Sequence, residues 1–240
     1  MKNIQIIILG LSVLLLTSCK NEVEKPKVSY DKTIKKTAEQ KADTTKIVVA
    51  DLPIQFDGTQ YLIFPVGNLN VSENSKWRYD SSSSGSNQSF NVANNMENEI
   101  TGYLQNLKFQ NIQKDTTIAL TDKPMLIQSV SYLSTIAART KQQTLVYLVA
   151  DSDTNEDGKL DVSDIKSLYL SDISGNKFTK ISADFQEVLD WKIIEAKNRL
   201  YFRTIDDTNK NGKFDKDDKV HYNFVNLLEK DWKAVEFMPI

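Results

Sequence analysis

The chain has 240 residues and carries 30 lysines and arginines against 32 aspartates and glutamates, which gives a formal net charge of −2. Such a balanced charge offers no basis for binding nucleic acid or another strongly charged polymer. Cys19 is the only cysteine, so an intramolecular disulfide is excluded. If the chain is exported, its core or a bound metal must therefore stabilise it.

The N-terminus has the pattern of an export signal. Lys2 precedes an apolar run over residues 4–16, which is shorter than the roughly 20 residues needed to cross a bilayer as a helix. The run ends in Leu-Thr-Ser-Cys at residues 16–19. These four residues resemble the bacterial lipobox, in which the cysteine becomes the lipidated first residue. The resemblance implies a signal peptide over residues 1–18 and a lipid on Cys19 that anchors the protein to a membrane.

A polar stretch follows the cysteine. Residues 19–46 are rich in lysine, glutamate and threonine, with Tyr30 as the only aromatic residue. Because such a segment buries too little apolar area to offset its ordering entropy, we predict a flexible tether here. Glu22 and Glu24 lie close behind Cys19, which is similar to the acidic patch of Bacteroidetes lipoproteins that reach the cell surface. This similarity implies a location at the bacterial outer membrane or cell surface.

Two acidic segments, residues 153–164 and 207–218, share one spacing. A calcium loop of the EF-hand kind needs oxygen ligands at positions 1, 3, 5, 9 and 12, a backbone carbonyl at 7 and glycine at 6. The first segment places at the ligand positions Asp153, Asn155, Asp157, Lys159, Asp161 and Asp164. The second places there Asp207, Asn209, Asn211, Lys213, Asp215 and Asp218. Position 6 is Gly158 in one segment and Gly212 in the other.

Both segments resemble the EF-hand and dockerin calcium-loop family. EF-hands usually carry Glu at position 12, whereas dockerin-type loops carry Asp, as Asp164 and Asp218 do here. The resemblance implies two Ca²⁺ sites. We expect the first loop to bind more tightly, because Asn211 replaces a carboxylate in the second and calcium affinity follows ligand charge.

The chain after residue 46 predicts β-structure. Its apolar segments are short, rich in β-branched and aromatic residues, and separated by polar turns, which favours strands. The expected strands cover residues 47–52, 61–66, 103–112, 116–120, 125–133, 143–150, 167–173, 177–181, 199–205, 220–226 and 232–237. Residues 164–170 are also compatible with a short helix. Residues 80–98 are rich in serine and asparagine, and predict a long surface insertion, with a binding loop as the alternative.

Apolar positions recur with the spacing of the two acidic segments. Tyr147 corresponds to Tyr201, and Phe178 to Trp232, which predicts a repeated structural unit. We expect an all-β domain over residues 47–240, built from repeated four-stranded antiparallel units. The units cover about 46–121, 125–182 and 185–238, and each calcium loop connects the second strand of its unit to the third.

One of these units resembles a propeller blade. Residues 168–181 read Leu-Tyr-Leu-Ser-Asp-Ile-Ser-Gly-Asn-Lys-Phe-Thr-Lys-Ile, which is similar to the blade repeat of the periplasmic Tol-system propeller protein. The resemblance implies blades of four strands and says nothing about catalysis. Three units are fewer than a closed propeller normally needs. An open β-domain, a ring completed by two chains and a further blade within residues 67–110 all remain compatible with the pattern.

Catalytic motifs are scarce in the sequence. His221, the only histidine, lies in an alternating segment where a structural role is expected. Glu187, Asp190 and Glu195 could form a paired-carboxylate site, but they also suit a solvated turn and a strand edge. We therefore expect no enzyme.

The expected function is that of a calcium-binding, membrane-anchored envelope module for binding or scaffolding. Three tryptophans, Trp77, Trp191 and Trp232, are candidates for contacting a protein or glycan ligand, and Trp77 is the one expected to be exposed. One alternative is a dockerin-like module that docks onto a cohesin-type partner, which requires a helix after each loop. Another is a calcium-dependent hydrolase, which requires an acid and a base in one cleft.

Overall fold

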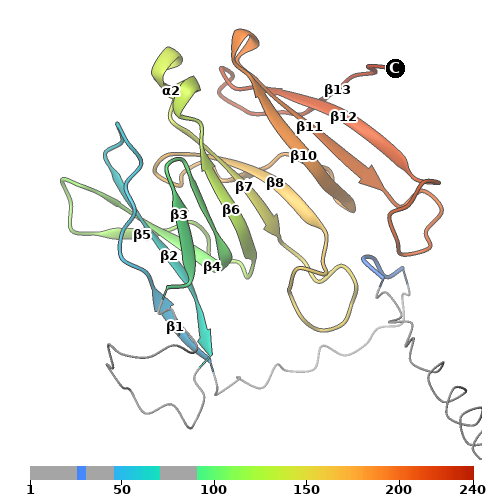
Figure 1. Cartoon of the computed structure of the whole chain (residues 1–240), viewed down its shortest axis with the longest axis horizontal. Coiled ribbons are helices and arrows are strands. Elements are labelled where there is room, and N and C mark those ends of the chain that lie inside the picture. Colours follow the sequence, from blue (N-terminus) through green and yellow to red (C-terminus); the bar gives the residue numbers. More distant parts are fainter. Residues whose placement is uncertain (1–25, 31–45, 71–90) are drawn as a thin grey trace, which may run out of the picture.

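The computed structural model describes residues 26–30, 46–70 and 91–240 (Figure 1). The expected signal peptide, Cys19, most of the tether and Trp77 lie outside these residues. In the described part of the chain, no helix is long and apolar enough to cross a bilayer. Its strands form two antiparallel sheets, which confirms the predicted all-β fold.

The larger sheet has nine strands. They are β1 (Lys46–Ala50), β2 (Tyr61–Asn70), β3 (Ala93–Met96), β4 (Glu99–Asn111), β5 (Thr117–Ala119), β6 (Leu126–Tyr132), β7 (Thr144–Ala150), β8 (Lys166–Asp172) and β9 (Thr179–Lys180). Their order is β1-β2-β4-β6-β7-β8-β9, and β3 and β5 both pair with β4. Because β4 also pairs with β6, the first two expected units lie in one continuous sheet.

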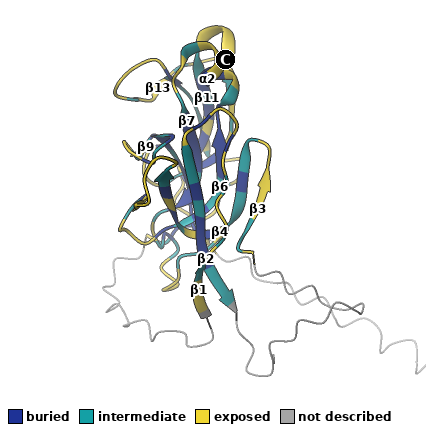
Figure 2. Ribbon diagram, turned by 90° about the vertical axis from the view of Figure 1, so that its left-hand side faces the viewer, coloured by how far each residue is buried: buried dark blue, intermediate teal, exposed yellow. Residues whose placement is uncertain are grey.

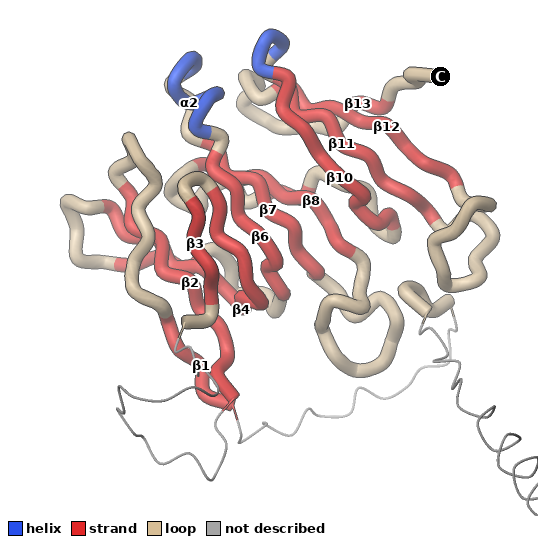
Figure 3. Tube along the Cα trace, viewed as in Figure 1, coloured by secondary structure: helices blue, strands red, loops and turns tan. Residues whose placement is uncertain are grey.

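The smaller sheet has four strands in chain order. These are β10 (Gln186–Ile194), β11 (Arg199–Asp206), β12 (Lys219–Asn226) and β13 (Val235–Glu236). Two short helices connect strands in the C-terminal half of the chain. α2 (Ser134–Thr140) lies between β6 and β7, and the 3₁₀ helix η1 (Glu195–Lys197) lies between β10 and β11. Both helices lie at the top of Figure 3, at the opposite end of the strands from the two long loops.

The core lies on both faces of β7. Tyr147 points to one cluster, which it shares with Ile63 of β2 and Leu104 of β4. Val146 points to the other, which it shares with Leu200 and other residues of the smaller sheet. Each fully buried side chain of this size contributes about 1.5–3 kcal/mol. The continuous apolar run of β7 thus holds the two sheets together. Figure 2 shows β7 largely buried and β3 exposed at the side of the sheet.

Residues 80–90 of the predicted surface insertion lie outside the described residues, and its C-terminal end contains a strand at the surface. Residues 93–96 form β3 and pair with β4 instead of looping out. The carboxylate of Asp51 accepts hydrogen bonds from the backbone N–H groups of Val92 and Ala93 at 3.0 and 2.9 Å, which fixes the start of this hairpin. Gly102 permits its close approach, because a Cβ there would lie 2.6 Å from the carbonyl oxygen of Val92.

Candidate metal centre

Each of the two acidic loops connects two neighbouring antiparallel strands. The first loop, residues 153–164, joins β7 to β8, and the second loop, residues 207–218, joins β11 to β12. In Figure 1 the first loop lies below β8, and the second lies at the right of the view, below the ends of β11 and β12. Strands follow both loops, since residues 166–172 form β8 and not the short helix that the sequence also allowed.

The backbone of the two loops has the same unusual conformation. Position 4 has a positive φ in both, 56° at Glu156 and 58° at Lys210. Position 6 has a φ of 81° in both, at Gly158 and Gly212. Glycine adopts this region without the steric cost of a Cβ, which explains its place at the sharp turn.

The carboxylate at position 1 ties the turn together. Asp153 accepts hydrogen bonds from the backbone N–H groups of Asp157, at 3.1 Å, and Gly158, at 2.8 Å. Asp207 does the same in the second loop, with N–H groups at 3.0 and 2.6 Å at positions 5 and 6. Asp207 is only 5% exposed.

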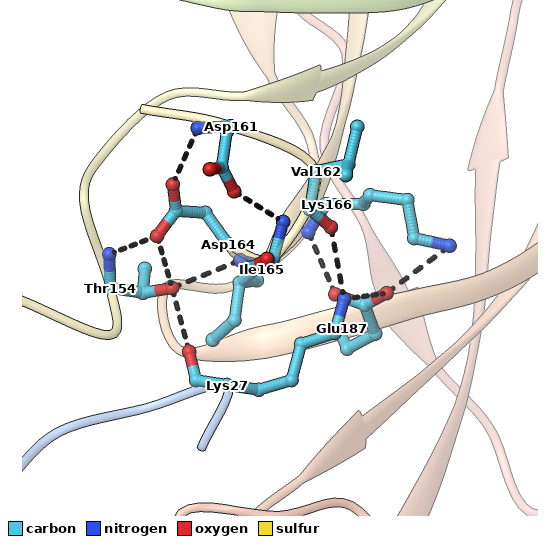
Figure 4. Close-up of polar contacts among 9 residues, drawn as sticks. Lys27, Thr154, Asp161, Val162, Asp164, Ile165, Lys166 and Glu187 are labelled. Carbon is cyan, nitrogen blue, oxygen red and sulfur yellow. Dashed lines mark hydrogen bonds and ion pairs between the residues drawn. The ribbon is translucent and has the colours of Figure 1, made fainter. Parts of the chain in front are cut away.

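The carboxylate at position 12 closes the first loop from its far end. Asp164 is fully buried and accepts hydrogen bonds from the backbone N–H groups of Thr154, at 2.8 Å, and Asp161, at 2.9 Å (Figure 4). The Thr154 hydroxyl accepts a further bond from the N–H of Ile165, at 3.0 Å.

The second loop repeats this closure. Asp218 accepts hydrogen bonds from the N–H groups of Thr208 and Asp215 at 3.0 and 2.8 Å, and the Thr208 hydroxyl accepts one from the N–H of Lys219 at 3.1 Å. The same three bonds therefore form in each loop, and two of them, those of Thr154 and Thr208, join the two ends of the loop.

The side chains at the remaining ligand positions also accept hydrogen bonds from backbone N–H groups of their own loop. Side-chain oxygens at positions 3, 5 and 9 accept the N–H groups at positions 5, 7 and 11, at 2.8–3.0 Å in both loops. The acceptors are Asn155, Asp157, Asp161, Asn209, Asn211 and Asp215. The N–H of Asp217 and the side chain of Asn211 lower the pKa of Asp215 below its ordinary value. The backbone carbonyls of Lys159 and Lys213 are the expected ligands at position 7, and both residues are exposed.

The two loops offer the ligand types that calcium prefers, namely carboxylate, amide and backbone carbonyl oxygens. Among the described residues, no three His, Cys, Asp or Glu side chains meet in the arrangement of a complete metal site. The acidic oxygens of the loops are engaged with backbone amides, and calcium coordination by them stays a prediction.

Five residues of the expected tether lie against both loops. Residues 26–30, here called the strap, hydrogen bond through their backbone to Thr154 in the first loop and Gly212 in the second. Val28 is only 2% exposed. Burial and the neighbouring Asp207 raise the pKa of Tyr30 to about 12. The sequence predicts a flexible segment here, and its only contrary signals are the isolated Val28 and Tyr30.

The three acidic residues of β10 and η1 do not form one site. Glu187 is buried and accepts a hydrogen bond from the N–H of Lys166 at 2.8 Å, and its carboxylate lies 3.1 Å from the Lys166 ammonium. Asp190 forms an exposed ion pair with Arg203, which lowers the pKa of its carboxyl group. Glu195 follows the other end of the strand. The expected solvated turn is therefore wrong for Glu187, which links the two sheets.

His221 lies between two carboxylates. Its Nδ1 is 2.9 Å from Glu236 Oε1, and its Nε2 is 3.3 Å from Asp206 Oδ2. Burial raises the pKa of Asp206, but the hydrogen bond from the Thr208 hydroxyl and the nearby imidazole of His221 outweigh it, so that the pKa of Asp206 is lowered. His221 thus ties the end of β11 to the C-terminal strand β13.

Aromatic residues line a shallow depression on the smaller sheet. It has a volume of about 390 Å³, and its walls include Trp191, Tyr201, Tyr222 and Phe237 beside the Asp190–Arg203 pair. Trp191 and Trp232 both pack against the core of the smaller sheet, but only Trp191 also lines this depression. Of the two tryptophans that the structure describes, Trp191 therefore lies where a ligand could reach it.

A second depression, of about 310 Å³, lies beside the first loop and contains Asp151 and Lys180. Burial raises the pKa of Asp151, but hydrogen bonds from Lys180 and Tyr169, both 2.7 Å long, outweigh it and leave the pKa below its usual value of 3.8. Since the folded pKa is the lower one, the ionised carboxylate stabilises the fold above pH 3.8. That contribution is lost as the pH falls through the folded pKa.

Asp151→Asn is therefore expected to lower the free energy of unfolding at pH 7 by about 1 kcal/mol, a value reduced for partial solvent screening. The loss should fade below pH 4, because the carboxyl group is then protonated in the unfolded chain and, as the pH falls through its lowered pKa, in the folded protein as well. Urea unfolding of both proteins between pH 3 and 7 measures it, with exposed Asp57→Asn as the control. An equal loss at pH 3 and pH 7 would contradict this account.

No protein-family model matches the chain, and a search of curated proteins finds no significant match.

Proposed function

We propose that this protein is a calcium-binding lipoprotein of a bacterial envelope, whose β-domain serves binding or scaffolding. The observation that carries the proposal is the agreement between the two loops. They share their ligand spacing and their positive φ angles at positions 4 and 6. In both loops, side chains of the loop also accept hydrogen bonds from the N–H groups at positions 2, 5, 6, 7, 9 and 11. Independent polar turns have no physical reason to agree in all of these respects.

Calcium would act in this domain as a folding element. Each loop concentrates carboxylates at the end of a strand pair, where like charges repel one another. A bound divalent cation neutralises that charge and ties the two ends of the loop together. It would thereby fix the connection between β7 and β8, and that between β11 and β12.

The strand pattern supports the proposal of a structural repeat. Strands β6–β9 and β10–β13 each follow one another in antiparallel order. In both groups a short helix precedes the second strand and an acidic loop precedes the third. We infer that the groups are equivalent propeller-like blades in an open arrangement, since β4 continues the first group into a larger sheet.

The structure favours this reading over the two alternatives. A dockerin-like module needs a helix after each loop, whereas β8 and β12 occupy those places. A calcium-dependent hydrolase needs an acid and a base in one cleft, whereas Glu187 and Asp190 are each paired with basic side chains. The ligand of a non-catalytic module would be a protein or glycan, and the depression around Trp191 is the candidate surface.

The strap sets how far the domain can lie from the proposed lipid anchor. Cys19 precedes residue 26 by seven residues, which span at most about 25 Å when extended. A lipid on Cys19 would therefore place the two loops close to the bacterial outer membrane or cell surface. A tether that ran freely to residue 46 would leave the domain much farther away.

Calorimetric titration of calcium into the purified protein is expected to show two sites. Asp153→Ala should remove the tighter site and Asp207→Ala the weaker one, because the first loop has one more carboxylate. Asp115→Ala, an exposed acidic residue outside the loops, should leave both sites intact. The absence of calcium-dependent heat would overturn the proposal, and equal losses in the two loop variants would overturn the ranking.

A further inference from the structure

The strap joins the two loops through backbone hydrogen bonds. The N–H of Lys27 donates to the carbonyl oxygen of Gly212 in the second loop, at 2.7 Å. The N–H of Ser29 donates to the carbonyl oxygen of Thr154 in the first loop, at 2.8 Å. The hydroxyl of Thr154 donates in return to the carbonyl oxygen of Lys27, at 2.9 Å. Three consecutive residues thus connect loops that lie far apart in the sequence.

The two residues whose carbonyl oxygens the strap contacts also donate their N–H groups to predicted calcium ligands. The N–H of Gly212 is bound by Asp207, at 2.6 Å, and the N–H of Thr154 by Asp164, at 2.8 Å. Both carboxylates are buried, with exposures of 5% and 0%. A movement of either carboxylate would therefore move the residue whose carbonyl oxygen the strap contacts.

Side chains add specificity to this contact. The Lys27 ammonium lies 3.6 Å from the buried carboxylate of Glu187 (Figure 4). Ser29 donates a hydrogen bond to Glu156 of the first loop, at 3.1 Å, and Lys210 of the second loop lies over the ring of Tyr30 at 6.0 Å. The strap therefore contacts position 4 of both loops as well.

We propose that the strap couples the two calcium loops. It docks when both loops are closed, so calcium in one loop favours docking and thereby raises the calcium affinity of the other. This inference rests on the proposed calcium binding. One buried valine and a few hydrogen bonds oppose the entropy of ordering five residues, so docking is close to balance and responds to either loop. Coupling of this kind is reciprocal between the sites.

Val28→Asp tests the coupling, because a carboxylate cannot remain buried where the valine lies. In calorimetry on the full chain in detergent, this variant is expected to bind calcium about fivefold or more weakly at both loops. Val48→Asp is the matched control, since Val48 is 67% exposed and belongs to neither the strap nor the loops. Ser29→Pro provides a second variant without a buried charge, because it removes the N–H that donates to Thr154 and the hydroxyl that donates to Glu156.

Amide hydrogen exchange in chelator tests the link independently of calcium. Asp207→Ala is expected to speed exchange of the Ser29 N–H by about tenfold or more, although that N–H bonds to the other loop. If calcium binds but both strap variants retain the wild-type affinities, the coupling is refuted. Unchanged Ser29 protection in Asp207→Ala would refute it too. If the wild-type protein binds no calcium, the proposed function fails, and the exchange result alone still decides whether the strap links the loops.

Discussion

Saturating calcium is expected to raise the free energy of unfolding of this protein by about 5 kcal/mol. A ligand that binds only the folded state contributes about 2.7 kcal/mol at one hundred times its dissociation constant, and two loops are proposed here. The melting temperature should then rise by roughly 10 °C or more, given the usual sensitivity of domains of this size. Thermal unfolding followed by circular dichroism, in calcium and in chelator, measures the change.

The physical reason for this effect lies in the loop ends. Asp153 and Asp164 come from opposite ends of the first loop, and each is held by amides of the loop itself. In an unfolded chain these carboxylates are far apart and bind a cation weakly, so the binding free energy is added to the free energy of folding.

A double variant, Asp153→Ala with Asp207→Ala, serves as the control. Calcium should leave its melting temperature unchanged, because both loops have lost the carboxylate at position 1. A calcium-dependent increase that persists in the double variant would place the ion elsewhere. Equal melting temperatures of the wild-type protein in calcium and in chelator would count against a stabilising role for the metal.

The strands were predictable where the apolar residues form a clear pattern, either a continuous run or an alternation. The apolar run of β7 and the alternating residues of β12 indicate strands directly, and both form. The short β3 was not predictable, because its sequence, Ala-Asn-Asn-Met, favours turns. Its pairing depends on Asp51 and Gly102, which only the folded chain brings next to it.

The loops could be predicted from the sequence, whereas the strap could not. The loop spacing is a local pattern, so the sequence indicates it, and the structure adds the matching conformation of Gly158 and Gly212. The strap was missed because composition averages over a window, and one valine among lysines and glutamates predicts disorder. Its partners, Thr154 and Gly212, lie more than a hundred residues away in the sequence, and no local pattern encodes such a contact.

Asp164→Ala is expected to lower the free energy of unfolding by about 2–4 kcal/mol even in chelator. The substitution leaves the N–H groups of Thr154 and Asp161 without an acceptor, and the variant site is buried. A buried donor that loses its partner costs about 1–3 kcal/mol. Urea unfolding in chelator isolates this effect from any contribution of calcium.

Asp218→Ala removes the equivalent carboxylate from the second loop and should cost less than about 1 kcal/mol. Asp218 accepts the same pair of amide hydrogen bonds, from Thr208 and Asp215, but these donors are exposed, so water replaces the lost acceptor. The comparison therefore reports mainly on burial, because both sites share the two amide hydrogen bonds of 2.8–3.0 Å. Asp164 adds only longer bonds, from the Thr154 hydroxyl at 3.3 Å and the Asn155 N–H at 3.4 Å. Equal losses in Asp164→Ala and Asp218→Ala would show that burial of the first loop does not set its contribution to stability.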